Sequence, residues 1–105
     1  MADVELSPDA RERLERLFPP EEREEAARLL TQECGANLPL LGDRDAAGLD
    51  RFRFAALKVS GGSLPALREA IRLAQVDWRD LLVAAGFAHD PLAHERWEPE
   101  EPNDG

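Results

Sequence analysis

The sequence predicts an all-α protein: a single small bundle of about five short helices, followed by a disordered acidic tail. Apolar residues recur along most of the chain at the spacing of a helix that buries one face. Residues that start and stop helices separate these stretches, and none of them has the alternation of a strand. The length of 105 residues suits one domain. We therefore expect a helical domain at residues 1–97 and a tail at residues 98–105.

The first two helices are predicted over residues 7–18 and 20–34. Ser7 is placed to cap free backbone N–H groups, and a proline follows it at a position where the first turn tolerates proline. A pair of prolines separates the two helices. The apolar face of the second helix continues to Cys34, and we expect Gly35 to end that helix in the left-handed conformation.

Three more helices are predicted over residues 49–59, 63–74 and 77–85. The first of them is apolar on two sides, which predicts a central position in the bundle. Ser63 and Asp77 are each placed to cap the helix that follows.

The end of the chain predicts one or two further helical turns and then disorder. Asp90 precedes a proline, the pattern of a helix start, and the turns would extend to Arg96. Trp97 can then fold back onto the bundle. The residues after it are acidic and contain no large apolar side chain, a composition typical of disorder.

The composition indicates where in the cell the protein is expected and which classes of partner are disfavoured. The 13 basic and 22 acidic residues give a net charge of −9, which disfavours nucleic acid and anionic membranes as partners. No apolar stretch approaches the ~20 residues of a membrane span, and no secretion signal begins the sequence. We expect a cytoplasmic protein without membrane association. The middle helices alone offer an excess of basic groups, on Arg51, Arg53, Lys58, Arg68, Arg72 and Arg79.

Candidate catalytic and metal-binding residues are few. Asp90 and His94 are four residues apart and share a helix face, but His89 and His94 are five apart and do not. Cys34, the single cysteine, continues an apolar face and is expected to be a buried core thiol. We therefore predict no catalytic residue, no metal and no cofactor.

The segment from Arg51 to Phe87 resembles small helical bacterial proteins known only as hypothetical. The resemblance depends on the helix Phe54-Ala55-Ala56-Leu57-Lys58, the turn Ser60-Gly61-Gly62 and the helix start Val76-Asp77-Trp78-Arg79-Asp80. It implies a bacterial source, and it implies no activity, cofactor or catalytic residue.

The functional prediction is a small non-enzymatic protein–protein interaction module whose partner has a basic surface. An alternative is a nucleic-acid-associated regulator, and a third is a small metal-dependent enzyme that uses His89 and His94. The sequence neither predicts nor excludes homo-oligomerisation. The predicted interaction residues are Arg51, Arg68, Arg72, Arg79 and Trp97.

Overall fold

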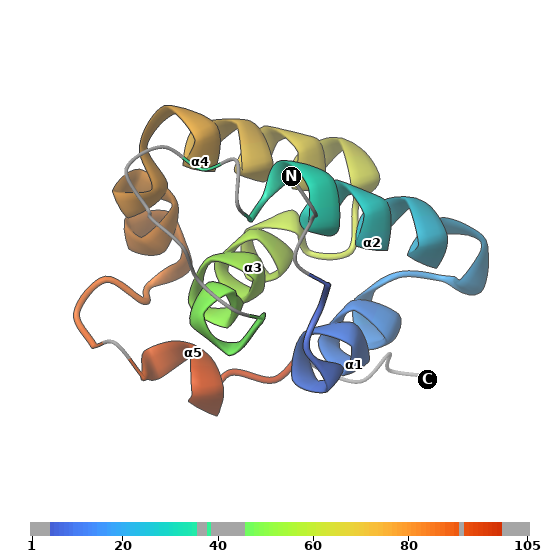
Figure 1. Ribbon diagram of the computed structural model, residues 1–105, viewed down its shortest axis with the longest axis horizontal. Helices are drawn as coiled ribbons and strands as arrows, with labels where there is room; N and C mark the ends of the chain where they lie inside the picture. The colour runs from blue at the N-terminus through green and yellow to red at the C-terminus, as the bar shows by residue number, and fades with distance from the viewer. Residues whose placement is uncertain (1–4, 36–37, 39–45, 91, 100–105) are drawn as a thin grey trace.

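The computed structural model describes residues 5–35, 38, 46–90 and 92–99. This part of the chain forms helices and no strand, which confirms the all-α prediction. Residues 100–105 of the predicted tail lie outside the described residues. The helices are α1 (Pro8–Leu17), α2 (Pro20–Glu33), α3 (Ala46–Ser60), α4 (Leu64–Ala85) and α5 (Ala93–Arg96) (Figure 1).

The predicted helix starts at Ser7 and Ser63 are confirmed, whereas α3 begins at Ala46, before the predicted residue 49, and α5 begins at Ala93 with Leu92 and not Asp90 at its N-cap. The Ser7 side chain accepts a hydrogen bond from the Ala10 backbone N–H at 3.0 Å, so it caps α1. Ser63 caps α4 in the same way, by accepting from the N–H of Ala66. α1, α2 and α4 each carry a proline in the first turn, where its missing N–H has no helical partner to lose.

Asp77 divides α4 into two segments, as the sequence predicted. Its backbone is non-helical, with φ −158° and ψ 105°. Its carboxylate accepts a hydrogen bond from the Arg79 N–H at 3.0 Å, which is the bond of a helix N-cap. The predicted helices at 63–74 and 77–85 are therefore the two segments of one bent element.

The predicted left-handed conformation of Gly35 is wrong. Among the described glycines, positive φ occurs at residues 61, 62 and 86. At Gly35 the requirement is space, because an added Cβ would lie 2.8 Å from Nη2 of Arg53. The end of α2 therefore needs glycine so that a buried guanidinium can approach the backbone.

α3 is the centre of the bundle, which confirms the prediction from its two apolar sides. It packs against α1, α4 and α5, while α2 packs against α1 and α4 (Figure 1). Phe52, Phe54 and Leu57 of α3 are almost completely buried. Arg53 is also fully buried, so it does not contribute to the excess of basic groups that the middle helices were expected to offer.

No described helix is both long and apolar enough to cross a lipid bilayer.

Candidate functional site

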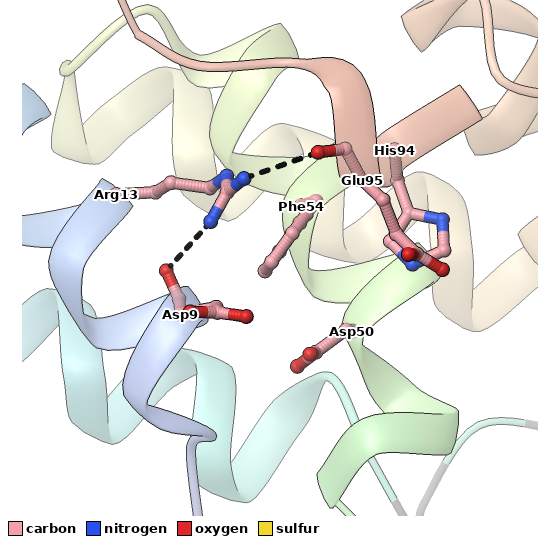
Figure 2. A pocket seen from close by; sticks show the side chains of 6 residues that line it. All are labelled: Asp9, Arg13, Asp50, Phe54, His94 and Glu95. Carbon is pink, nitrogen blue, oxygen red and sulfur yellow. Dashed lines mark hydrogen bonds between the residues drawn. The ribbon is translucent and has the colours of Figure 1, made fainter. Parts of the chain in front are cut away.

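A pocket of about 320 Å³ opens where α1, α3 and α5 meet. Its volume is at the lower end of the roughly 300–1,000 Å³ that small-ligand pockets occupy, and it suits a single side chain better than a large cofactor. Each of the three helices contributes one carboxyl group to the lining (Figure 2). The lining residues are Asp9 and Arg13 of α1, Asp50 and Phe54 of α3, and His94 and Glu95 of α5.

Arg13 joins two walls of the pocket. Its Nε donates to the carbonyl of Trp97 at 2.9 Å, and its Nη1 donates to the carbonyl of Asp9 at 3.2 Å. Its Nη2 is 3.5 Å from the carbonyl oxygen of Glu95, a long hydrogen bond (Figure 2). The guanidinium carbon lies 4.2 Å from the centre of the Phe54 ring, within cation–π range. In the described part of the chain Arg13 pairs with no carboxylate, and its N–H groups donate to backbone carbonyls instead.

Asp50 is the most deeply buried carboxyl group of the pocket, with 9% of the residue exposed. Its Oδ1 accepts a hydrogen bond of 2.7 Å from the hydroxyl of Ser7, the residue that caps α1. Burial raises the pKa of Asp50, because a low-dielectric environment disfavours the charged carboxylate. The hydrogen bond from Ser7 and the charge of His94 oppose this rise.

The raised pKa of Asp50 predicts a pH dependence of stability. A carboxyl group with a raised folded-state pKa stabilises the fold at pH values below its unfolded-state pKa, and this contribution is lost as the pH rises through the folded-state pKa. Asp50→Asn removes the titration and keeps an oxygen that can accept from Ser7. Relative to wild type, the variant is therefore expected to gain stability as the pH rises from about 3 to about 7. Urea unfolding at both pH values measures the difference, and a constant difference would contradict the prediction.

The two histidines occupy different environments. His89 is exposed, whereas His94 is 7% exposed and packs edge-on against Phe54, with the ring centres 5.3 Å apart. Asp90 accepts hydrogen bonds from the N–H of residue 92 and from Arg96. Within the described residues, no group of three or more His, Cys, Asp or Glu side chains is arranged to hold a metal ion.

Cys34 is fully buried, which confirms the prediction of a core thiol. Burial raises the pKa of its thiol to about 12, and the charge of Arg53 opposes this rise only in part. The side chain is therefore protonated at neutral pH and lacks the thiolate form that a nucleophile needs.

Arg51 and Arg79, two of the predicted interaction residues, are engaged within the molecule. Arg51 is half-buried, and its Nη2 donates to the carbonyl of Phe87 at 2.9 Å. Its Nε is buried and forms no hydrogen bond within the described part of the chain. Arg79 is exposed and pairs with Asp77 across 3.1 Å.

Arg68 and Arg72 lie four residues apart on α4, beside a small groove between α2 and α4. Arg68 forms an ion pair of 3.2 Å with Glu25 of α2. Arg72 is exposed and is in no ion pair with any other described residue. The groove has a volume of about 190 Å³ and is lined by Leu29, Glu33, Arg68, Ile71, Arg72 and Gln75.

Trp97, the fifth predicted interaction residue, is half-buried and packs against the core. Its ring centre lies 6.3 Å from those of Phe54 and Phe87. The structure thus brings together Arg68 and Arg72 but places Arg51, Arg79 and Trp97 elsewhere. Three of these four arginines already have a partner within the molecule: Arg51 donates to the carbonyl of Phe87, Arg68 pairs with Glu25 and Arg79 pairs with Asp77.

Sequence reasoning missed most residues of the pocket. In the sequence, Asp9 follows the Ser7-Pro8 helix start, Arg13 lies among the charged residues of the first predicted helix and Phe54 lies in an apolar helix, and none of these patterns points to a pocket. The contacts that define the pocket join residues far apart in sequence: 43 positions separate Ser7 from Asp50, and 84 separate Arg13 from Trp97. No pattern among neighbouring residues in the sequence predicts such pairs.

Comparisons of the chain with protein-family models, with curated proteins and with solved structures found no match. The resemblance of residues 51–87 to small bacterial proteins therefore stays a prediction.

Proposed function

We propose that this protein is a non-enzymatic interaction domain that binds a protein partner with a basic surface. The observation that carries the proposal is how the arginines are used in the described part of the chain. One group donates hydrogen bonds to backbone carbonyls, and a second group pairs with carboxylates. The first group is Arg13, Arg23, Arg51 and Arg53, and the second is Arg16, Arg28, Arg68, Arg79 and Arg96.

Among the described residues, the surface therefore presents more carboxylates than basic groups to a partner. Among the described residues, the basic side chains outside both groups are Arg11, Lys58 and Arg72, and Lys58 lies 5.0 Å from the centre of the Phe87 ring. A larger set of exposed carboxylates is in no described ion pair: Glu5, Asp9, Glu15, Glu21, Glu24, Glu33, Glu69, Asp80, Glu95 and Glu98.

An excess of negative charge of this kind selects a positively charged partner. Complementary charges accelerate encounter and exclude partners of the same sign. The pocket between α1, α3 and α5 also has an excess of negative charge. Three carboxyl groups line it beside one guanidinium, which already donates to backbone carbonyls.

Titration of the full chain with an oligoarginine peptide tests the proposal. We expect saturable one-to-one binding at low ionic strength, and we expect it to weaken as salt screens the charges. Isothermal titration calorimetry measures both, with an oligoglutamate peptide of the same length as the control. If oligoarginine fails to bind at low salt, or binds without saturation, the proposal is wrong.

A further inference from the structure

We propose that residues 92–99, which we call the strap, open as a unit while α1 to α4 stay folded, and that Arg13 holds the strap in its closed position. The strap contains α5 and lies at the edge of the bundle, against α3 (Figure 1). In its closed position it covers an aromatic surface of the bundle. The opening does not depend on the identity or the charge of a partner, so it is separate from the proposed function.

The aromatic surface under the strap consists of Phe54 of α3 and Phe87, which follows the end of α4. The ring centre of His94 lies 5.3 Å from that of Phe54 and 6.4 Å from that of Phe87. The ring centre of Trp97 lies 6.3 Å from both. Phe54 and Phe87 are each only 2% exposed. Because two rings of the strap pack against them, the strap controls access of solvent or a partner to this surface.

Arg13 connects α1 to the backbone of the strap. Its Nε donates to the carbonyl of Trp97 at 2.9 Å, and its Nη2 makes the longer bond of 3.5 Å to the carbonyl of Glu95 (Figure 2). The residue is 7% exposed, so water competes little for these donors. Hydrogen bonds from a charged donor are stronger than those between neutral groups. Both bonds join positions more than 80 residues apart, and they therefore exist only while the strap is closed.

The strap has few apolar anchors in the core. α5 has four residues and no side-chain cap, far fewer than the roughly 12–15 residues that an isolated helix needs. Leu92 is 55% exposed, and Ala93 and Trp97 pack against the core only as partly buried residues. The buried residues of the strap are His94 and Pro99. A segment with so little buried apolar surface opens at a lower free energy than the core.

The strap separates from the bundle after Phe87. The N–H of Phe87 donates to the carbonyl of Leu82 at 2.8 Å, and the side chain is buried, so Phe87 remains with α4. Ala88 and His89, which follow it, are exposed and lie in a turn. Backbone rotation in this turn moves the strap without moving a core residue, as in the opening of a local folding unit.

Native-state hydrogen exchange of the full chain, followed by NMR, tests the opening. The N–H of Trp97 donates to the carbonyl of His94 in the closed strap, and the released segment is too short to keep this bond. Relative to intrinsic rates, we expect the Trp97 amide to be protected about tenfold or more and to exchange about a hundredfold or more faster than the amide of Leu57 in α3. Low concentrations of urea are expected to accelerate the exchange of Leu57 much more than that of Trp97, because opening the strap exposes less surface than global unfolding.

Two arginine variants test the role of Arg13. Arg13→Ala is expected to accelerate the exchange of the Trp97 amide about tenfold, because the closed strap loses its donor and the open strap loses nothing. Arg23→Ala is the matched control, since Arg23 also donates to two backbone carbonyls, those of Phe18 and Glu15, but not to the strap. This substitution destabilises the closed and the open state alike and is expected to leave the exchange of Trp97 within about twofold of wild type.

Three results would overturn the proposal. Exchange of the Trp97 amide at the rate of an unfolded peptide would mean that the strap is not closed in the native protein. Equal protection and equal urea dependence for Trp97 and Leu57 would mean that the strap opens only when the whole domain unfolds. Both of these results come from the wild-type protein and do not depend on a variant that folds. Equal acceleration of the Trp97 exchange by Arg13→Ala and Arg23→Ala would exclude Arg13 as the residue that holds the strap.

Discussion

Replacing Arg53 by alanine is expected to lower the free energy of unfolding by about 3–5 kcal/mol. Arg53 is fully buried at the centre of the bundle. Its Nε donates to the carbonyl of Cys34 at 3.0 Å, and its Nη1 donates to the carbonyl of Glu5 at 2.9 Å. One side chain thereby ties the end of α2 and the segment before α1 to α3. The substitution leaves a cavity and removes donors from both carbonyls, a large loss against a total stability of about 5–15 kcal/mol.

Urea unfolding of Arg53→Ala beside wild type measures this loss. Arg53→Lys keeps the positive charge but cannot reproduce the fork of donors, so it is also expected to be destabilised. Arg72→Ala is the matched control, because Arg72 is exposed and a surface substitution of this kind changes stability by about 0.5 kcal/mol or less. A loss below about 1 kcal/mol for Arg53→Ala would show that the buried hydrogen bonds are not needed.

Gly62→Ala is expected to destabilise the fold by about 2–4 kcal/mol, more than the same change at Gly61. Gly62 has φ +91°, and an added Cβ would lie 2.5 Å from the carbonyl oxygen of Leu17. A backbone oxygen at a helix end cannot rotate away as a side chain could, so the turn or α1 has to shift. The turn between α3 and α4 therefore depends on glycine for both its conformation and its contact with α1.

Gly61→Ala is the control for this prediction. Gly61 has φ +60°, and an added Cβ would meet no atom within 4 Å. The alanine variant therefore carries only the left-handed backbone cost of about 1–2 kcal/mol. Thermal and urea unfolding of the two variants isolate the steric contribution of the contact with Leu17. Equal losses in both variants would contradict the close approach.

The starts of α1, of α4 and of the α4 segment after Asp77 were predictable because each depends on a few neighbouring residues. Ser7 and Ser63 bond to N–H groups three positions away, and Asp77 bonds to one two positions away. Gly86 has φ +79° at the end of α4, a position where glycine ends helices at little steric cost. The central place of α3 was predictable as well, because a helix that is apolar on two sides has to be covered on both.

The roles of the arginines were not predictable in the same way. Arg51, Arg53 and Arg79 look alike in a sequence, yet Arg51 donates to the carbonyl of a residue 36 positions away, Arg53 is fully buried and Arg79 is exposed. Gly35 illustrates the same difficulty, because the atom that requires glycine there belongs to a side chain of another helix. Helix periodicity assigns a residue to a face, but it does not say which neighbour covers that face.

The order of the helices, the caps at Ser7, Ser63 and Asp77 and the net charge of −9 follow from short-range patterns and composition, so they were predictable without a structure. The division of the arginines between internal carbonyls and surface carboxylates depends on packing. So does the pocket, in which Asp9, Asp50 and Glu95 come from three helices. Contacts across tens of residues arise only when the bundle closes, because the distance between two side chains on different helices is set by how those helices pack and not by their separation along the chain.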